Sequence, residues 1–366
     1  MKLIADSGST KTDWTVVPDG TAADCKTASG SKASSGSKAS SGSKASSGSK
    51  ASSGSKASSG SKASSASDSS SQLTIATQGI NPFHQSASVI DKIIEEELIP
   101  QLASAGAAVD DAASCGTADT TPSCKVGCNE NFLREVGCNE NFLRGAGCEI
   151  HFYGAGCTAE ASPLLAECLH RHFGKEASVE VGSDMLGAAR ALCQHGEGIA
   201  CILGTGANSC YYDGTDIREN VSPLGYILGD EGSGAYIGKR LVGDVLKHQF
   251  SPAVCDLFHS ETGLDAATII NKVYRQPMPN RFLGNVARFC SNHRDNDEIH
   301  SFLVDCFRQF FQRNVANYRR PSLPVHFVGS VAWAYETELS EAAETSGFHV
   351  GAIMRSPMEG LLKFHS

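Results

Sequence analysis

The chain lacks the features that would place it in a membrane, outside the cell or on a nucleic acid. No apolar run approaches the roughly 20 residues needed to cross a bilayer, and a motif that begins at Asp6 leaves no room for a signal peptide. The formal net charge is −9, whereas nucleic-acid phosphates attract basic surfaces. We therefore expect a cytoplasmic protein with neither a membrane nor a nucleic-acid partner.

Paired-cysteine metal motifs are also missing. None of the 14 cysteines forms a C-x-x-C pair, and the cysteines between Cys124 and Cys157 owe their ten-residue spacing to a duplicated segment. Without an export signal, free thiols in a reducing compartment are the expected state. A metal or iron–sulfur site on these cysteines is not the favoured interpretation.

Two segments look foreign to a folded core. The hexamer Gly-Ser-Lys-Ala-Ser-Ser repeats six times over residues 30–65 and carries six lysines. It has no apolar residue larger than alanine, which predicts a flexible, positively charged linker. Residues 126–134 (VGCNENFLR) recur at 136–144. Two copies are too few for a solenoid, so this second segment is expected to be an irregular loop.

What the chain does contain is three short segments with glycine, each directly after a β-type run. They are residues 6–13, 204–209 and 328–332. Each puts small residues where backbone N–H groups could close on a phosphate or a nucleoside. A single turn of this kind could occur by chance, but three spread over most of the chain suggest a nucleotide held between two lobes. A length of 366 residues is enough for two domains.

The first segment combines a carboxylate with hydroxyl groups. Asp6 ends a strand and could hold Mg²⁺ through water, with Mg²⁺ bridging the β- and γ-phosphates. Gly8 is expected to turn the backbone with a positive φ. The residues that follow supply hydroxyl donors and a positive charge: Ser9, Thr10, Lys11 and Thr12. The alternative is an ordinary strand turn capped by serine and threonine.

The other two segments extend the same reasoning. Gly204 and Gly206 allow close backbone approach, and Thr205 between them donates a hydrogen bond. Gly329 and Ser330 would let a base and ribose lie against the backbone. The third segment is weak on its own.

Competing nucleotide motifs can be tested on the sequence. The chain has no Gly-x-x-x-x-Gly-Lys-Ser/Thr run, which excludes a P-loop. Residues 154–159 (GAGCTA) do fit the Gly-x-Gly-x-x-Ala dinucleotide pattern, and Glu180 lies where a ribose-binding acid would be. A lone match is common by chance, so we interpret Gly154 and Gly156 as a close-packed strand–helix turn.

Polar residues in three places are candidates for catalysis or substrate binding. Asp184 is expected to open a helix, where it could face a cleft or act only as an N-cap. Asp230 and Glu231 lie between glycines, which indicates either a loop presented to a ligand or a solvated turn. Asn81 could bind a sugar, or could simply form an Asn-Pro turn. His84 and His151 are expected to be structural or surface residues.

Elsewhere the pattern alternates between strands and helices. Strands are predicted over residues 3–5, 14–17, 149–153, 179–181, 199–203, 209–212 and 325–328. Helices are predicted over residues 87–99, ending at Pro100, over 162–173 with Ser162 as N-cap and proline at N1, over 185–192 and 357–365, and through most of 232–318.

In combination, residues 6–14, 78–82, 182–184, 204–209 and 225–233 resemble the N-acetylglucosamine kinase family. This is the BadF/BadG/BcrA/BcrD-type ATPase branch of the sugar kinase–actin–heat-shock chaperone superfamily. The resemblance covers residues 1–18, 74–104 and 149–366. It implies an α/β fold of two ribonuclease H-like (actin-like ATPase) lobes with a nucleotide cleft between them, with ATP and Mg²⁺ as cofactors and a small sugar as substrate.

The resemblance also implies roles for single residues. Residues 8–12 and 204–206 would hold the phosphates, with Thr205 at the terminal ones, and Gly329 and Ser330 would lie against adenosine. Asp184 would take the proton from the 6-hydroxyl of the sugar. The implied sugar-binding residues are Asn81, Asp184, Gly225 and Asp230.

The resemblance divides the chain into a sugar-side lobe, residues 1–196, and an ATP-side lobe, residues 197–366. The first lobe carries the inserts at 28–71 and 106–147, where the chain departs from the family, and the terminal helix 357–365 would pack back on it. Two other functions stay open, namely an ATPase that drives a partner enzyme and a non-catalytic regulator that binds sugar or nucleotide. The oligomeric state is also open, with a homodimer as one option.

Overall fold

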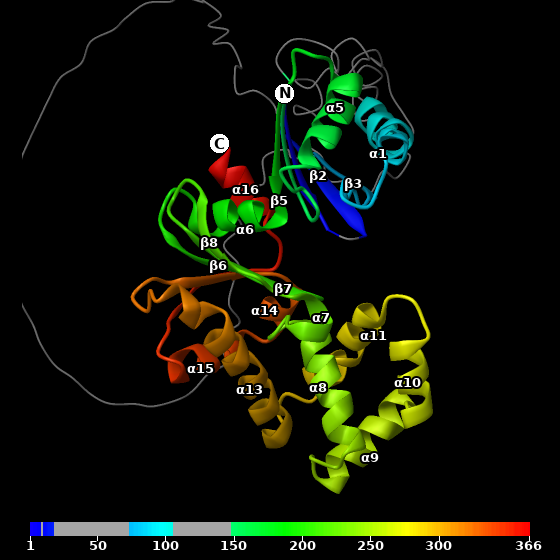
Figure 1. Cartoon of the computed structure of the whole chain (residues 1–366), viewed down its shortest axis with the longest axis vertical. Helices are drawn as coiled ribbons and strands as arrows, with labels where there is room; N and C mark the ends of the chain where they lie inside the picture. The colour runs from blue at the N-terminus through cyan, green and yellow to red at the C-terminus, as the bar shows by residue number, and fades with distance from the viewer. Residues whose placement is uncertain (9, 18–72, 105–147) are drawn as a thin grey trace, which may run out of the picture.

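Figure 1 shows the computed structural model of the chain, which describes residues 1–8, 10–17, 73–104 and 148–366. Both repeated segments, 30–65 and 126–144, lie outside the described residues. Two five-stranded sheets, each with its own helices, follow one another along the chain. None of the described helices combines the length and the apolar character needed to cross a membrane.

The first sheet has the strand order β3-β2-β1-β4-β5. β1 pairs antiparallel with β2, and β2 with β3, whereas β1–β4 and β4–β5 are parallel. β1 lies in the centre, so its Leu3, Ile4 and Ala5 are all buried. The bounds are Lys2–Ser7 for β1, Lys11–Val17 for β2, Leu73–Gln78 for β3, Glu149–Gly154 for β4 and Ser178–Ser183 for β5.

The second sheet repeats this order. Its strands run β10-β9-β6-β7-β8, so that β6 stands where β1 stands and β9 where β4 stands. The β6–β7 and β7–β8 pairs are antiparallel, and β6–β9 and β9–β10 are parallel. The bounds are Gly198–Leu203 for β6, Ala207–Tyr212 for β7, Ile217–Val221 for β8, Val325–Val328 for β9 and Val350–Met354 for β10. The expected α/β architecture of two related lobes is confirmed.

The helices beside the first sheet correct two expectations. α1, Ala87–Ile93, continues through the π-helix η1, Ile94–Leu98, and helix persists to residue 104 beyond Pro100. The wide π turn accommodates a residue that has no N–H and whose ring crowds the carbonyl four residues earlier, so Pro100 does not end the helix. α5, Ser162–Phe173, has Ala161 rather than Ser162 at its N-cap, which leaves proline at the second helical position.

The expected strands and most expected helices are confirmed with bounds shifted by a few residues. α6, Asp184–Cys193, follows β5 directly, and helices fill most of residues 232–318. The strands β3, β8 and β10 and the helices α7, α14 and α15 were not predicted. In the second lobe the bounds are Gly225–Leu228 for α7, Gly234–Leu246 for α8, Pro252–Thr262 for α9, Ala266–Tyr274 for α10, Pro279–Val286 for α11, Arg288–Asn292 for α12, Asp297–Arg313 for α13, Val315–Tyr318 for η2, Ser330–Ala334 for α14, Glu336–Thr345 for α15 and Met358–Phe364 for α16.

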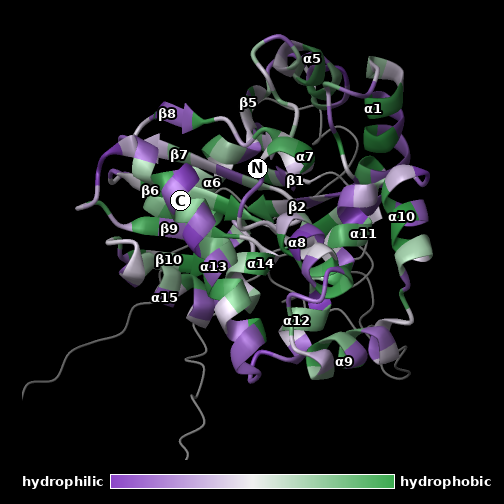
Figure 2. Cartoon of the chain, turned by 60° about the horizontal axis from the view of Figure 1, so that its bottom comes forward, coloured by the Kyte–Doolittle hydropathy of each residue, from purple (hydrophilic) through white to green (hydrophobic). Residues whose placement is uncertain are grey.

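Each sheet has its own apolar core. In the first, Trp14 packs edge-on against Phe152 with 5.5 Å between the ring centroids, and the indole Nε1 donates to Thr77 Oγ1. In the second, α13 presents Phe307, Phe310 and Phe311 to the sheet. In Figure 2 green and purple residues alternate along the helices at the surface, as expected of helices that bury one face.

The C-terminal helix contacts the first sheet. α16 packs on α6 and β1, and Leu361 is buried with Ile4 and Tyr153. A Cβ on Gly360 would lie 2.4 Å from the carbonyl oxygen of Ala191, so only glycine allows this close approach. Lys2 Nζ donates to the backbone carbonyl of His365. Figure 1 accordingly places the N- and C-termini near each other.

Candidate active site

One cavity of about 440 Å³ is lined by residues from all three glycine-bearing segments. Thr10 comes from the β1–β2 turn, Gly204 and Thr205 from the β6–β7 turn, and Ser330 from the turn after β9. Segments distant in sequence therefore border one polar space between the two sheets. The remaining lining residues are Gly234, Arg281, Gly284, Asn285, Arg288 and Val331.

The second turn is fixed by backbone hydrogen bonds. Gly204 N–H donates to the Gly206 carbonyl at 2.9 Å, which closes the turn. The first amides of α8 donate back to it, from Gly234 to the Gly204 carbonyl at 2.8 Å and from Ala235 to the Thr205 carbonyl at 3.1 Å. No atom lies within 4 Å of a Cβ placed on Gly204. A ligand can thus approach this backbone without a side chain in the way.

The third turn requires glycine. Gly329 has a φ of 127°, which side-chain-bearing residues rarely adopt. A Cβ there would lie 2.3 Å from the carbonyl oxygen of Leu203, the last residue of β6. Gly329 N–H also donates to the Met354 carbonyl at 2.9 Å. This packing aims Ser330, the first residue of α14, at the cavity.

The first turn departs from expectation in its glycine. Gly8 N–H donates to the Lys11 carbonyl at 2.9 Å, but Gly8 is not among the glycines with positive φ, so that prediction was wrong. The tight contact belongs to Gly79, which follows β3. A Cβ on Gly79 would lie 2.6 Å from the Gly8 carbonyl oxygen and 2.9 Å from the Thr10 nitrogen. Ser9 lies outside the described residues.

Two expected phosphate ligands of this turn have other partners. The Thr12 hydroxyl is buried, 2.7 Å from Ser7 Oγ, and accepts from Ile80 N–H at 3.1 Å. The ammonium of Lys11 lies 2.6 Å from a carboxylate oxygen of Asp13. Among the described residues of this turn, Thr10 is therefore the one that lines the cavity.

Two carboxylates meet at the carboxyl edge of the first sheet. Burial, together with the nearby charges of Asp13 and Asp184, raises the pKa of Asp6 to about 7. Burial also raises the pKa of Asp184, although the Met185 N–H donates to its Oδ1 at 2.8 Å. The N-cap of α6 is Ser183, whose hydroxyl accepts from Leu186 N–H at 3.1 Å. Asp184 is thus free of the capping role that was its alternative explanation.

A single carboxylate with adjacent phosphates is the usual protein contribution to a Mg²⁺ site. Asp6 fits that pattern, because its carboxylate is half-buried and carries neighbouring negative charge that a cation would relieve. Within the described residues there is no group of three or more His, Cys, Asp or Glu side chains arranged to hold a metal by themselves.

Asn81 lies against the turn after β4. A Cβ on Gly156, which has a φ of 80°, would lie 2.1 Å from Asn81 Oδ1. That oxygen also accepts from Phe83 N–H at 3.1 Å. A side-chain amide of the protein thus fills the space that a pyrophosphate would need. Glu180 is engaged as well, with Arg190 Nη1 donating to it at 2.6 Å and His151 Nδ1 2.8 Å away. The close-packed turn is confirmed and the dinucleotide alternative fails.

The loop before α8 is buried and strained. Asp230 is 8% exposed and Glu231 7%, so the solvated-turn alternative is wrong. Asp230 has a φ of 57°, a conformation uncommon outside glycine that is often found at functional sites. Burial raises its pKa to about 6, against hydrogen bonds from the backbone of Ala207 and Gly225. A Cβ on Gly206 would lie 3.1 Å from Asp230 Oδ2. The structure therefore brings the second phosphate turn and Asp230 together.

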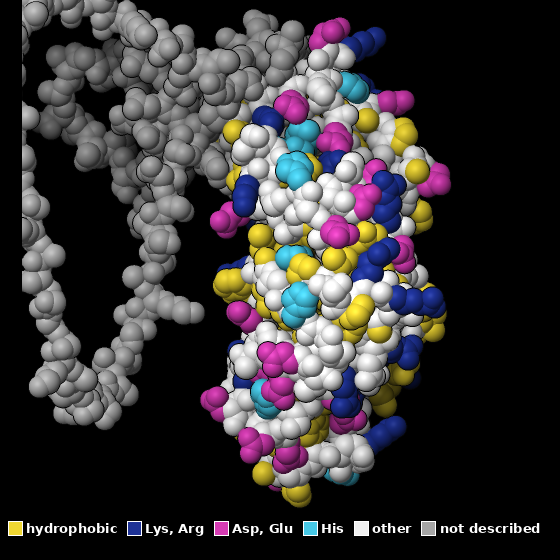
Figure 3. All heavy atoms as spheres, turned by 90° about the vertical axis from the view of Figure 1, so that its left-hand side faces the viewer, with side chains coloured by type: hydrophobic (Ala, Val, Ile, Leu, Met, Phe, Trp, Pro, Cys, Tyr) yellow, Lys and Arg dark blue, Asp and Glu magenta, His cyan; other side chains and the backbone are white. Residues whose placement is uncertain are grey.

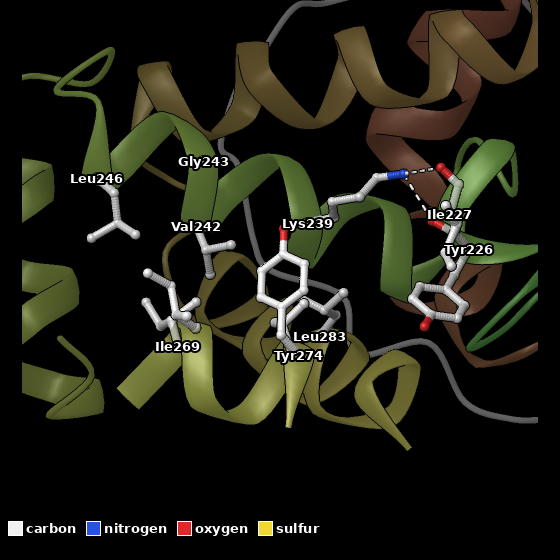
Figure 4. A pocket seen from close by; sticks show the side chains of 11 residues that line it. Tyr226, Ile227, Lys239, Val242, Gly243, Leu246, Ile269, Tyr274 and Leu283 are labelled. Carbon is white, nitrogen blue, oxygen red and sulfur yellow. Dashed lines mark hydrogen bonds between the residues drawn. The ribbon is translucent and has the colours of Figure 1, made fainter. Parts of the chain in front are cut away.

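An apolar cavity of about 430 Å³ lies behind this loop, between α7, α8, α10 and α11 (Figure 4). Lys239 of α8 lines this cavity and donates to the Tyr226 carbonyl at 2.8 Å. The ammonium also lowers the pKa of Asp230 through its charge. Lys239 thus holds α7, and with it Gly225, in position ahead of Asp230.

Several residues of the site were not anticipated from the sequence. Gly79 and Lys239 act through contacts between distant segments, which leave no local signal. Arg281 and Arg288 line the polar cavity. With Gly284 and Asn285 they follow the i, i+3, i+4, i+7 spacing of one helix face, a signal that could have been found.

No family model and no curated protein matches the chain. A solved structure from Porphyromonas gingivalis, named "Putative N-acetylglucosamine Kinase", is 37% identical, with a TM-score of 0.70 over 100% of this chain and 98% of that one. A Chromobacterium violaceum protein of the same name is 14% identical with a TM-score of 0.57, over 100% and 98%, and supports the fold. The chain belongs to the N-acetylglucosamine kinase family, within the sugar kinase–actin–heat-shock chaperone superfamily.

Proposed function

We propose that the protein transfers the γ-phosphoryl group of ATP directly to the 6-hydroxyl of an amino sugar, N-acetylglucosamine or glucosamine. Family membership makes it an ATP-dependent sugar kinase. The observation that carries the finer proposal is the joint placement of the site residues. Three glycine-bearing turns line one polar cavity, and carboxylates with raised pKa values lie next to two of those turns.

On this proposal the nucleotide lies in the polar cavity. The open backbone at Gly204 and the side chains of Thr10 and Thr205 contact the phosphates, and Gly329 and Ser330 lie against adenosine. Phosphoryl transfer depends on positioning and charge stabilisation more than on covalent chemistry, which suits a site built from backbone turns. The amides that α8 donates to the second turn keep it rigid during the reaction.

Asp184 acts as the general base. The 6-hydroxyl oxygen attacks the γ-phosphorus, its proton passes to the Asp184 carboxylate, and ADP leaves with the former bridging oxygen. A base works best when its pKa lies near the working pH, and burial moves the pKa of Asp184 in that direction. Asn81, Gly225 and Asp230 bind the other polar groups of the sugar.

Asp6 would hold Mg²⁺ through water. The ion, when bound with ATP, neutralises charge on the β- and γ-phosphates. The carboxylate of Asp6 would lose its neighbours' repulsion on binding the cation, because the charges of Asp13 and Asp184 are part of what raises its pKa.

The proposed division at residues 196 and 197 assigns Asn81 and Asp184 to a sugar-side lobe and the second and third turns to an ATP-side lobe. We also propose a cytoplasmic location.

Figure 3 shows charges of both signs interspersed on one face, which fits a small-molecule substrate better than a nucleic acid. A homodimer is the oligomer to test first.

The two alternatives receive less support. An ATPase that drives a partner through an iron–sulfur cluster needs thiolate ligands, but burial raises the pKa of Cys157 to about 12. The cysteines at 124, 128 and 138 lie outside the described residues. A regulator without catalysis would have no need of Asp184 beside Asp6.

A coupled assay of ADP release with a panel of sugars tests the proposal. We expect ADP release that depends on N-acetylglucosamine or glucosamine, with 6-phosphate as the product identified by NMR. Sugar-independent release would favour the partner-driving ATPase, and binding of sugar or nucleotide without any release would favour the regulator.

A further inference from the structure

We propose that Arg281 and Arg288 bind the polyphosphate of the nucleotide and supply the positive charge of its site. This inference rests on the proposed function. No part of the sequence resemblance assigns these residues. They come from the helical segment formed by α11 and α12, which borders the polar cavity on the side of the second turn.

The two arginines lie on one side of the α11–α12 segment, Arg281 within α11 and Arg288 at the start of α12. Arg281, Gly284, Asn285 and Arg288 all line the cavity, and their spacing of three, four and seven residues is that of neighbours along an α-helix. α11 is held close to α8, because a Cβ on Gly238 would lie 1.9 Å from the Leu283 carbonyl oxygen. The face therefore cannot withdraw from the cavity without unpacking the two helices.

Gly284 fixes the position of this face relative to the phosphate turn. A Cβ placed on Gly284 would be 3.7 Å from Thr205 Cγ2, in ordinary contact. Arg281 precedes Gly284 by about one helical turn and Arg288 follows it by about one. Both arginines line the same cavity as Thr205, the residue assigned to the terminal phosphates.

Charge accounting favours phosphate as the ligand. Arg281 and Arg288 are the only charged side chains among the described residues that line the cavity. Neither forms an ion pair with a carboxylate of the described residues. The nearby ammonium groups are engaged elsewhere, Lys11 with Asp13 and Lys239 with the Tyr226 carbonyl. A polyphosphate carries several negative charges, and arginine matches phosphate oxygens with paired N–H donors.

The test compares ligands with and without phosphates. Binding of ATP, ADP and adenosine to the full chain is measured by calorimetry for wild type and for Arg281→Ala and Arg288→Ala. Arg275→Ala is the matched control, since Arg275 is exposed at the end of α10 and does not line the cavity. Hydrogen bonds to charged groups contribute enough that each cavity variant should bind ATP about 10- to 100-fold more weakly.

The expected result is a loss of ATP affinity with adenosine and sugar affinity unchanged, and partial recovery in Arg281→Lys. Unchanged ATP affinity in either alanine variant, or an equal loss for adenosine, would overturn the assignment of that arginine. The proposed function is judged separately by wild type, because failure of wild type to bind ATP or to phosphorylate a sugar contradicts the kinase itself. Melting temperatures equal to wild type show that the variants are folded.

Discussion

The two sheets share one strand order but use their turns differently. The turn after β4 and the turn after β9 occupy equivalent places, and each has a glycine with positive φ, Gly156 and Gly329. At Gly156 the amide of Asn81 occupies the space beside the backbone. At Gly329 the close contact is with Leu203 inside the fold, and the next residue, Ser330, faces the polar cavity. On the proposed function, the turn after β9 can serve the nucleotide because the residue after its glycine borders an open cavity, whereas the turn after β4 is closed by Asn81.

The two hairpin turns differ in the same way. The carbonyls of the β6–β7 turn accept hydrogen bonds from the first amides of α8, and no atom lies within 4 Å of a Cβ placed on Gly204. The β1–β2 turn is braced by Gly79, and its Thr12 hydroxyl is used internally. The first sheet has carboxylates near its hairpin turn, because Asp6 and Asp184 lie close together at the edge of the sheet. On the proposed function, the proton-accepting carboxylate belongs to the first sheet and most of the nucleotide contacts belong to the second.

Removing the carboxylate chemistry should have the largest effect. Asp184→Asn keeps the shape of the side chain but cannot accept the hydroxyl proton, so turnover should fall about 10²- to 10⁴-fold. ATP binding, which we assign mainly to the second sheet, should stay within about twofold of wild type. Steady-state kinetics and calorimetry check the two parts. Asp256→Asn, an exposed site on α9, is the control. Near-normal turnover in Asp184→Asn would remove this residue from the role of base.

Alanine at two glycines of the second sheet should separate folding from binding. Gly329→Ala forces a Cβ to 2.3 Å from a carbonyl oxygen at a φ of 127°, and should lower the free energy of unfolding by about 2–5 kcal/mol. Gly204→Ala meets no atom within 4 Å, so its stability should change by less than about 1 kcal/mol. Its methyl group projects where a phosphate would approach, and the KM for ATP should rise.

Denaturant unfolding and ATP kinetics on both variants measure these effects. The comparison fails if Gly204→Ala is as unstable as Gly329→Ala, or if it keeps a wild-type KM for ATP. The first outcome would mean that other atoms of the protein pack against the backbone of Gly204. The second would mean that its open backbone is not where the nucleotide lies.

Much of this fold follows from local sequence patterns. β1, β4 and β6 are central or nearly central strands, and their apolar runs reveal them. β8 and β10 are edges of the second sheet, and β8 has the polar sequence IRENV with exposed residues. Such strands are defined by hydrogen bonds to a neighbour, which a local pattern does not encode. The predicted helix end at Pro100 was wrong for a related reason. The π-helix before this proline, which forms through packing, lets the helix continue.

The site shows the same limit. Short sequence motifs identified Asp184, Asp230 and the three turns, because each lies in a short run that contains glycine or acidic residues. The direction in which a side chain points was not visible. Thr12 and Thr10 are equivalent in the motif, yet one hydroxyl is buried and the other residue lines the cavity. Thr12 lies within β2, opposite Thr77 of β3, whereas Thr10 precedes the strand, and the motif alone does not show where the strand begins.

The smallest expected effect concerns the strained carboxylate beside the second turn. Burial raises the pKa of Asp230 to about 6, from 3.8 in an unfolded chain. Between these values the native state holds more protons than the unfolded state, so this group's contribution to stability is present below about pH 4 and is lost as the pH rises through 6. Asp230→Asn cannot ionise and tolerates the same backbone conformation.

The variant should therefore gain stability relative to wild type as the pH rises from 4 to 7. The gain is up to about 1.4 kcal/mol per pH unit and on the order of 2–3 kcal/mol in total. Urea unfolding at each pH measures it, with Asp295→Asn as an exposed control. A pH-independent difference between Asp230→Asn and wild type would mean that the pKa of Asp230 is the same in the native and unfolded states, so that the carboxylate is ionised above about pH 4. In that case Asp230 would enter the reaction as a fixed charge facing the sugar, and the contrast with the proton-accepting Asp184 would become sharper.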